Sequence, residues 1–444
     1  MIMNANHYSE LVELDKKHFV HPTSSIKQQQ EFGPAYIFTE AKGVMVKDIE
    51  GKEYIEGMSS LWNVNIGYGR EELGEAAMEQ IKTMSFSNAF YTFSHEPGIR
   101  LAEKLASISP GDLNHIFFTS GGSESNDTAF KLARHYWILK GEPNRKKIIA
   151  RKQAYHGVAT GSTSATGIKQ FHTMTNSLAP DFVHTEALSV DALRDTIEAE
   201  GPSTIAAFIA EPVMGAGGLF YPPEDYFAGI RNVCDEYGIL FITDEVITGF
   251  GRTGSLFCMD HYGVVPDMMT FAKGVTSGYF PLGGVMMSEK VFSVLKDKSD
   301  GPLFHGFTYS GHPVGCAVAL KNLEIIEKEQ LVQNAKERGE ELLAGFKQIE
   351  EEFEHIADIR GKGLLAAFDL FMDRDQKTRF PEKMAPKIMD EAMKRGLICR
   401  NITYGESDTV VFSPPLVISS EEISRLLMIL RESIQVVLNK IVVG

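Results

Sequence analysis

Apolar runs of strand length alternate with segments of helix length between about residue 98 and residue 330. The expected helices include 123–140, 190–200 and 226–237, and the apolar runs are 115–118, 147–150, 205–210, 239–242, 268–272 and 284–287. Continuous apolar strands separated by helices are typical of a mostly parallel sheet that is covered on both faces. We therefore expect residues 76–330 to form a large α/β domain.

The two ends of the chain have a different pattern. The elements expected there are an amphipathic arm around 11–19, a small antiparallel sheet over 36–57, a helix over 71–84, a long charged helix after 331, strands at 364–370 and 410–416, and a closing helix over 420–439. We expect residues 1–75 to supply an arm and part of a small domain. Residues 331–444 are expected to form a smaller C-terminal α+β domain.

The bulk composition excludes several classes of protein. The 444 residues are 43% hydrophobic and 23% charged, with a formal net charge of −15 and scattered basic residues, so a nucleic-acid partner is not expected. No stretch of about 20 uncharged apolar residues predicts a membrane span. The first ten residues lack the basic and then apolar pattern of a signal peptide. We expect a cytoplasmic protein.

The four cysteines, Cys234, Cys258, Cys316 and Cys399, lie far apart in the sequence. They form no C-x-x-C pair and have no histidine at metal-ligand spacing. We expect buried, reduced thiols and no metal site.

Two apolar runs lead to residues of opposite charge. The run 239–242 leads to Asp244, and the run 268–272 leads directly to Lys273. Ligands in open α/β sheets bind beyond the carboxyl ends of the strands, so this pair marks a candidate site. Taken alone, Asp244 also fits a turn or helix cap, and Lys273 also fits a solvated surface lysine.

A glycine-rich turn follows the run 115–118 and opens a helix. Gly121 and Gly122 let backbone N–H groups approach an anion closely, and Ser123 adds a hydroxyl donor. The spacing matches neither a P-loop nor a dinucleotide fingerprint, so a phosphate bound here would belong to another kind of cofactor. The alternative is a structural turn with a serine N-cap.

An aromatic residue completes the set of strand-end groups. Tyr155 follows the run 147–150 and can stack on a flat ring, although a tyrosine that closes the core fits as well. An anion cradle, an aromatic ring, a carboxylate and a lysine are together what pyridoxal 5'-phosphate requires. The lysine amine forms an imine with the cofactor's aldehyde, and the carboxylate keeps the pyridine nitrogen protonated.

These stretches resemble the class III aminotransferases, which are pyridoxal-phosphate enzymes of fold type I. The matching segments are 120–125, 155–157, 210–213, 243–246, 249–254, 272–274 and 308–313. The resemblance implies an aspartate-aminotransferase-like α/β fold, with a large domain built on a mostly parallel sheet and a smaller α+β domain. It implies ping-pong transfer of an amino group from an amine or ω-amino acid to a 2-oxo acid, with pyruvate as the expected acceptor.

The resemblance implies roles for the residues around the cofactor ring. Lys273 corresponds to the Schiff-base lysine, which also moves the substrate proton, and Asp244 corresponds to the partner of the ring nitrogen. Tyr155 would cover one face of the ring, and Val246 would pack on the other.

Phosphate binding is implied for a second set of residues. Gly122 and Ser123 would hold the phosphate, and Thr308 would reach it from the neighbouring subunit of a homodimer. The family commonly has serine or threonine where this chain has Gly121, so we expect a weaker cradle.

The substrate pocket resembles that of the ω-amine:pyruvate branch. Trp62 and Phe90 match the aromatic residues that line this pocket, and Arg400 matches the mobile arginine that binds a substrate carboxylate. An exposed arginine near a strand is the alternative for Arg400. Glu211 resembles the acidic residue that pairs with such an arginine when the substrate lacks a carboxylate.

Two other functions remain open from the sequence. The segment 57–62 is equally compatible with the biotin-synthesis aminotransferase that uses S-adenosylmethionine as its donor. A non-catalytic relative that keeps the fold as a binding module is the second alternative, and the presence of both Lys273 and Asp244 argues against it.

Overall fold

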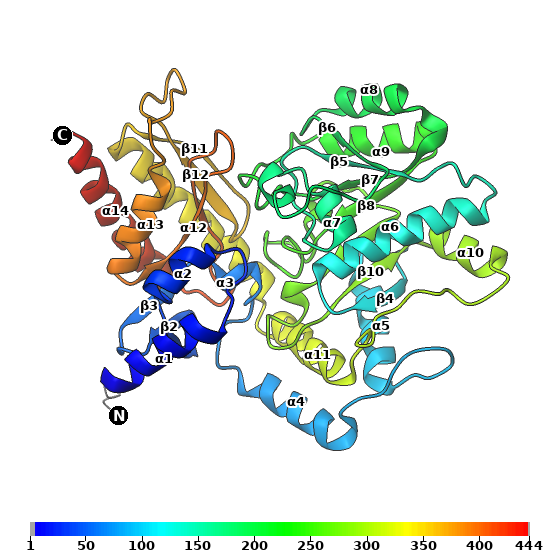
Figure 1. Cartoon of the computed structure of the whole chain (residues 1–444), viewed down its shortest axis with the longest axis horizontal. Helices are drawn as coiled ribbons and strands as arrows, with labels where there is room; N and C mark the ends of the chain where they lie inside the picture. The colour runs from blue at the N-terminus through cyan, green and yellow to red at the C-terminus, as the bar shows by residue number, and fades with distance from the viewer. Residues whose placement is uncertain (1–4, 443–444) are drawn as a thin grey trace.

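The computed structural model describes residues 5–442, and a seven-stranded sheet occupies the centre of its larger part (Figure 1). The strands follow the order β4-β10-β9-β8-β7-β5-β6. Their bounds are β4 (His115–Thr119), β5 (Lys147–Arg151), β6 (Phe182–Thr185), β7 (Ile205–Ala210), β8 (Leu240–Asp244), β9 (Met268–Phe271) and β10 (Gly283–Met287). Strands β5 to β9 pair in parallel, whereas β10 is antiparallel to both of its neighbours. The expected mostly parallel sheet is confirmed.

Helices cover both faces of this sheet, as its continuous apolar strands require. Successive strand residues point to opposite faces. Ile148 packs in one cluster with Phe130 of α6 (Gly122–Leu139), whereas Ile149 packs in another with Phe227 of α9 (Tyr226–Tyr237). The other helices around the sheet are α5 (Glu96–Ile108), α7 (Thr160–Ala165), α8 (Val190–Glu200), α10 (Glu289–Lys298) and α11 (Pro313–Lys328).

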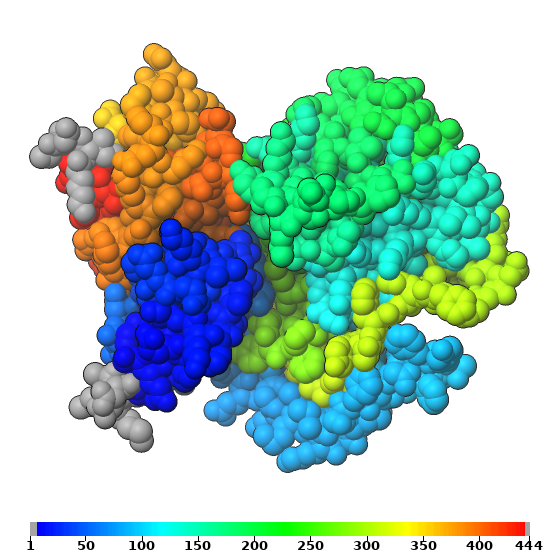
Figure 2. All heavy atoms as spheres, viewed as in Figure 1, coloured from blue at the N-terminus to red at the C-terminus, as the bar shows by residue number. Residues whose placement is uncertain are grey.

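The second part of the molecule is built from both ends of the chain. Its C-terminal elements are α12 (Leu331–Glu352), β11 (Ile356–Gly361), β12 (Ala366–Leu370), α13 (Ala385–Lys394), β13 (Leu397–Ile398), β14 (Arg400–Ile402), β15 (Thr409–Phe412) and α14 (Ser420–Val442). Strands β11, β12, β15 and β14 form one antiparallel sheet. Figure 2 shows the N-terminal residues, in blue, against this C-terminal part, in orange.

The N-terminal strands pair with the C-terminal part directly. Strands β1 (Phe38–Lys42), β2 (Met45–Asp48) and β3 (Glu53–Glu56) form the expected small antiparallel sheet. Strand β13 extends this sheet in parallel with β3. The arm before it consists of α1 (Ala5–His18) and α2 (Ile26–Phe32).

A short strained segment leads from the small sheet to the part of the molecule that contains the seven-stranded sheet. The four-residue helix α3 (Ser59–Trp62) contains positive φ angles at Ser59, Ser60 and Trp62. It is followed by α4 (Glu71–Met84), which packs against α11. Nowhere between residues 5 and 442 does a helix combine the length and the apolar character needed to cross a membrane.

Candidate active site

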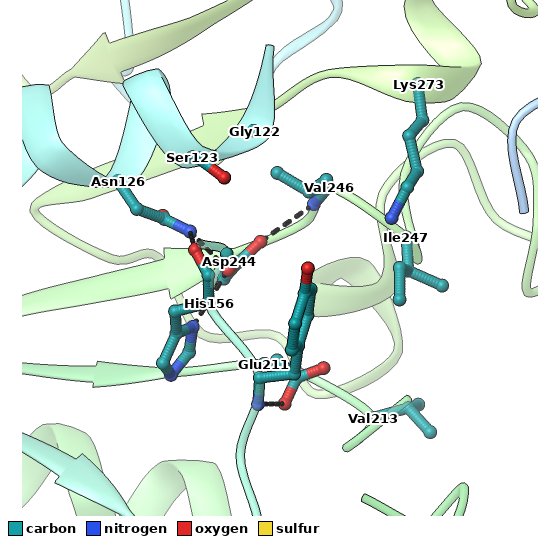
Figure 3. A pocket seen from close by; sticks show the side chains of 12 residues that line it. Gly122, Ser123, Asn126, His156, Glu211, Val213, Asp244, Val246, Ile247 and Lys273 are labelled. Carbon is teal, nitrogen blue, oxygen red and sulfur yellow. Dashed lines mark hydrogen bonds and ion pairs between the residues drawn. The ribbon is translucent and has the colours of Figure 1, made fainter. Parts of the chain in front are cut away.

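A cavity of about 150 Å³ lies where several strands of the large sheet end (Figure 3). Seven of the residues predicted from the sequence line it: Gly122, Ser123, Tyr155, Glu211, Asp244, Val246 and Lys273. They come from the ends of β5, β7, β8 and β9 and from the start of α6, the helix that follows β4. The residues predicted at the ends of the apolar runs therefore lie around one cavity.

Asp244 is the last residue of β8 and is only 4% exposed. Its Oδ2 accepts hydrogen bonds from Asn126 Nδ2 at 2.7 Å and from His156 Nδ1 at 2.8 Å. Its Oδ1 accepts the backbone N–H of Val246 at 3.1 Å. Three donors thus hold the carboxylate in one orientation.

Asn126 is itself fixed by further hydrogen bonds. Its amide nitrogen also donates to the carbonyl of His156 at 2.7 Å, and its amide oxygen accepts Thr270 Oγ1–H at 2.8 Å. Sequence reasoning gave no role to Asn126 or His156. Asn126 lies one helical turn after Gly122 on α6, so the i, i+4 spacing is a signal that could have identified it.

Lys273 reaches the cavity from the side opposite Asp244 (Figure 3). Burial lowers the pKa of its amine to about 8, an effect strengthened by Arg400 and opposed by Asp244 and Glu211. No ion pair joins Lys273 to Asp244 in the described part of the chain. The two charges therefore face the cavity separately, which leaves room for a ligand between them.

The start of α6 has the features expected of an anion-binding site. Gly121 is its N-cap and supplies no side chain, so the first N–H groups of this 18-residue helix have no side-chain cap. Ser123 Oγ accepts the N–H of Val158 at 3.0 Å, which leaves its own hydroxyl hydrogen free to donate. A Cβ added to Gly122 would lie 2.8 Å from Val246 Cγ1, so this glycine permits close packing.

Glu211 is buried and its carboxylate is engaged by backbone groups. Its Oε1 accepts the N–H of Tyr155 and its Oε2 accepts the N–H of Gly215, both at 3.0 Å. Burial raises the pKa of this carboxyl group. Glu211 thus ties the Tyr155 loop to the segment after β7, and within residues 5–442 it forms no ion pair with Arg400.

Arg400 and Trp62 lie together beside Lys273. The guanidinium carbon of Arg400 is 4.4 Å from the centroid of the Trp62 ring, and the Lys273 amine is 5.8 Å from it. Trp62 is 4% exposed, and its Nε1–H has no partner in the described chain. Burial lowers the pKa of Arg400, whereas Tyr404 and Tyr155 act in the opposite direction.

Phe90 and Thr308 are not brought into this cavity. Phe90 packs on Gly306, where an added Cβ would lie 2.9 Å from Phe90 Cζ, and it lines a separate cavity of about 790 Å³. Thr308 is exposed two residues further along the same loop. Gly121, at the N-cap, does not line the first cavity either. Among residues 5–442, no group of three or more His, Cys, Asp or Glu residues is arranged to hold a metal.

Comparisons with known proteins agree with this geometry. The family model for aminotransferase class III matches residues 26–434. The chain is 39% identical to putrescine–pyruvate aminotransferase of Pseudomonas aeruginosa, over 94% of each sequence. The chain belongs to the class III aminotransferases, and it is an enzyme that moves amino groups onto keto acids.

Solved structures give the same result for the fold. A transaminase from the marine bacterium Virgibacillus is 53% identical and superimposes with a TM-score of 0.96, covering 97% of this chain and 100% of that one. An (S)-enantioselective omega-transaminase from Thermomicrobium roseum is 45% identical, with a TM-score of 0.92 and coverage of 97% and 99%. The expected fold type I architecture and the ω-aminotransferase branch are thereby confirmed.

Proposed function

We propose that this enzyme binds pyridoxal 5'-phosphate between Asp244 and Lys273 and transfers an amino group from an amine or ω-amino acid to pyruvate. The observation that carries the proposal is the separation of the two residues on opposite sides of one buried cavity. A flat ring placed there has a carboxylate at one end and a lysine amine at the other. The family match and the ω-transaminase relatives support this assignment.

The residues of the cavity fit the cofactor. The uncapped start of α6 and the Ser123 hydroxyl suit a phosphate, because a helix N-terminus carries positive partial charge. Tyr155 and Val246 supply the surfaces for the two faces of the ring. Asp244 has one oxygen, Oδ1, that accepts only the Val246 N–H, so it retains an acceptor site for the protonated ring nitrogen.

When bound, the cofactor withdraws electrons from the carbon that carries the amino group and so makes its proton acidic. Lys273 Nζ takes that proton and returns it at the neighbouring position, which requires an uncharged amine. The lowered pKa of Lys273, about 8, makes this form far more available near neutral pH than it is for an ordinary lysine. Asp244 would face the ring nitrogen with a carboxylate that three donors hold in one orientation.

Arg400 would bind the carboxylate of pyruvate. Its guanidinium is half-buried beside Trp62 and has no carboxylate partner within the described residues, so a substrate carboxylate can form the paired hydrogen bonds. When the donor lacks a carboxylate, Glu211 would pair with Arg400 after its hydrogen bonds to Tyr155 and Gly215 are released. We propose Glu211 as that second partner.

A second copy of the chain would complete the site. Thr308 and Phe90 lie on one surface, away from the cavity of their own chain, and their neighbourhood exposes Phe86, Tyr91, Phe93, Phe304 and Tyr309. A cluster of exposed aromatic residues marks an interaction surface. We propose a homodimer in which Thr308 reaches the partner's cofactor phosphate and Phe90 lines the partner's substrate pocket.

The small domain of this enzyme would comprise residues from both ends of the chain, with the large domain spanning 76–330. Strand β13 pairs with β3, which supports that division. All four cysteines are buried and free, which fits a reducing compartment, and we propose the cytoplasm.

A donor screen tests the proposed function. The purified enzyme is supplied with β-alanine, putrescine or simple amines, with pyruvate as acceptor, and alanine formation is measured. Turnover is expected, and it is expected to vanish in Lys273→Ala together with the absorbance of lysine-bound cofactor. Turnover only with S-adenosylmethionine and 7-keto-8-aminopelargonate would instead establish the biotin-synthesis alternative.

A further inference from the structure

The turn that carries Lys273 has an unfavourable backbone conformation. Lys273 begins a short 3₁₀ turn, Lys273–Val275, and its φ of +48° lies in the left-handed region. For a residue other than glycine, such a conformation costs on the order of 1–3 kcal/mol and persists only where the surroundings enforce it. Some neighbouring group must therefore hold this turn.

The hydrogen bonds within the turn itself are long. The N–H groups of Val275, Thr276 and Ser277 donate to the carbonyls of Ala272, Lys273 and Gly274 at 3.2, 3.3 and 3.3 Å. These distances exceed the usual value of about 2.9–3.0 Å for N–H···O bonds. The backbone bonds alone give the turn little rigidity.

Asn322 of α11 makes shorter bonds to the same turn. Its amide nitrogen donates to the carbonyls of Gly274 and Val275, both at 2.9 Å. Its amide oxygen accepts the hydroxyl of Ser277 at 2.7 Å. Asn322 is fully buried, and its amide nitrogen and amide oxygen are both engaged by this one turn.

Packing also restrains the turn. A Cβ added to Gly274 would lie 2.5 Å from Asn65 Nδ2 and 3.2 Å from Phe250 Cβ, so Gly274 is in direct contact with both residues. Asn65 is fixed in turn, because its amide oxygen accepts Arg252 Nη2–H at 3.0 Å. The turn is thus held between Asn322 and Asn65.

We propose that Asn322 is a positioning residue that fixes the Lys273 turn and thereby the place of the Lys273 amine in the cavity. The inference rests on the proposed role of Lys273 in proton transfer. A displacement of the turn moves the root of the lysine side chain, and a misplacement of about 1 Å at reacting atoms can reduce a rate by about a hundredfold. Asn322 itself does not line the cavity, so it acts only through Lys273.

The position of the turn also affects the charge state of the amine. Lys273 faces Asp244 and Glu211, which favour its protonated form, and Arg400, which disfavours it, while burial disfavours it most. Tyr155 also lines the same cavity. A looser turn admits water, weakens the effect of burial and raises the pKa of Lys273.

The test uses the holoenzyme with Asn322→Leu, which keeps the approximate shape but removes the amide. Ser277→Ala removes one bond to Asn322, at 2.7 Å, together with the longer bond from the N–H of Ile66, at 3.2 Å, and serves if the first variant folds poorly. Asn334→Leu is the matched control, because Asn334 of α12 likewise donates to two carbonyls, those of Leu416 at 2.6 Å and Ile418 at 3.0 Å.

For Asn322→Leu we expect kcat to fall at least about tenfold, with KM for pyruvate changed less than about twofold. The acidic limb of the pH–rate profile should move to higher pH. The pH midpoint of the lysine-bound cofactor absorbance should move in the same direction, by about half a unit. Ser277→Ala should show smaller changes of the same kind. The control should lose thermal stability alone.

The inference is overturned if Asn322→Leu and Ser277→Ala lose only stability and keep the wild-type kcat, pH profile and absorbance midpoint. Failure of the proposed function gives a different result. In that case the wild-type enzyme would bind no cofactor through Lys273 and would form no alanine from pyruvate.

Discussion

The guanidinium carbon of Arg400 lies 4.4 Å from the centroid of the Trp62 ring, and no carboxylate pairs with it between residues 5 and 442. An arginine and an indole at this distance attract each other through the ring's quadrupole. The contact is weaker than a paired bond to a carboxylate, so a substrate carboxylate can replace it. Arg400 is therefore held near the cavity without being neutralised.

Arg400→Lys should weaken the use of pyruvate. A lysine cannot form the paired hydrogen bonds of a guanidinium, so kcat/KM for pyruvate should fall about 10- to 100-fold. The half-reaction of a simple amine should change less than about twofold, because that donor has no carboxylate to bind. Separate stopped-flow measurements of the two half-reactions check this.

Arg379→Lys is the matched control for that experiment. Arg379 also lies over an aromatic ring, 3.9 Å from the centroid of Phe371, and pairs with Asp369, whereas Arg400 shares the ring of Trp62 with Lys273. Equal losses of kcat/KM for pyruvate in both variants would show a general structural effect and would contradict the role of Arg400.

We expect substitutions along the hydrogen bonds that support Asp244 to reduce stability and cofactor retention in a graded way. Asn126→Leu removes a donor to the carboxylate and leaves Thr270 Oγ1 without its acceptor, whereas Thr270→Val removes only the outer bond. We expect Asn126→Leu to cost about 1–3 kcal/mol in the free energy of unfolding, and Thr270→Val less. Urea denaturation and the rate of cofactor loss on dialysis measure the two effects. Equal cofactor loss in both variants would contradict this order.

Gly121 and Gly122 should respond oppositely to substitution. Gly121 has an extended φ of 176°, and a Cβ added there meets nothing within 4 Å, so Gly121→Ser fits and adds a hydroxyl at the N-cap of α6. Tighter cofactor binding, about two- to tenfold in Kd, is expected from one added hydrogen bond. Gly122→Ala places its Cβ 2.8 Å from Val246 Cγ1 and should weaken binding. Fluorescence titration of cofactor-free protein measures both constants, and a weaker Kd in Gly121→Ser would refute the prediction.

The pH dependence of Lys273 follows from its burial. With its pKa lowered to about 8, its amine in the cofactor-free protein should react with an acylating reagent about tenfold faster per pH unit up to about 8 and then level off. A rise that continues to the ordinary lysine value, about 10.4, would contradict the burial effect. Mass spectrometry of the labelled peptide follows this residue alone.

The same shift has a consequence for stability with a definite sign. Between about pH 8 and about 10.4 the unfolded chain retains the Lys273 proton, whereas the folded, cofactor-free chain has lost it. Stability rises with pH wherever the unfolded state binds more protons. The contribution of Lys273 should therefore become less unfavourable over this range, and Lys273→Met should remove that part of the pH dependence.

Most of the fold was predictable because its central strands are buried on both faces. All six apolar runs form strands, since a continuous apolar stretch of this length is typical of a strand that is buried on both faces and is too short for most helices. Strand β6 was missed because its sequence, Phe182–Thr185, contains a histidine and a threonine. The reversed direction of β10 was also missed, because direction depends on the connections and leaves no trace in a short apolar run.

From the residues themselves the site was predictable where they follow strands, and the family resemblance added Trp62 and Arg400. That rule identified Asp244, Lys273 and Tyr155, because the carboxyl ends of parallel strands meet at one edge. It gave no role to Asn126 and Asn322, which lie on helices, where a buried amide looks like any solvent-facing one. Asn126 has only the weak signal of its i, i+4 spacing from Gly122. The importance of Asn322 depends on which turn α11 faces, and that relation exists only in the folded chain.

The pairing of β3 with β13 determines the order in which parts of this protein can fold during synthesis. Lys52, beside β3, donates to the carbonyl of Met393, 341 positions later. At a translation rate of about 5–20 residues per second, the N-terminal strands wait about 17–70 s for their partner strand to leave the ribosome. During that interval β1, β2 and β3 have an open edge, while the seven-stranded sheet, encoded between β3 and β13, can already form. Chaperones that shield open strand edges should therefore matter most for the nascent segment Phe38–Glu56.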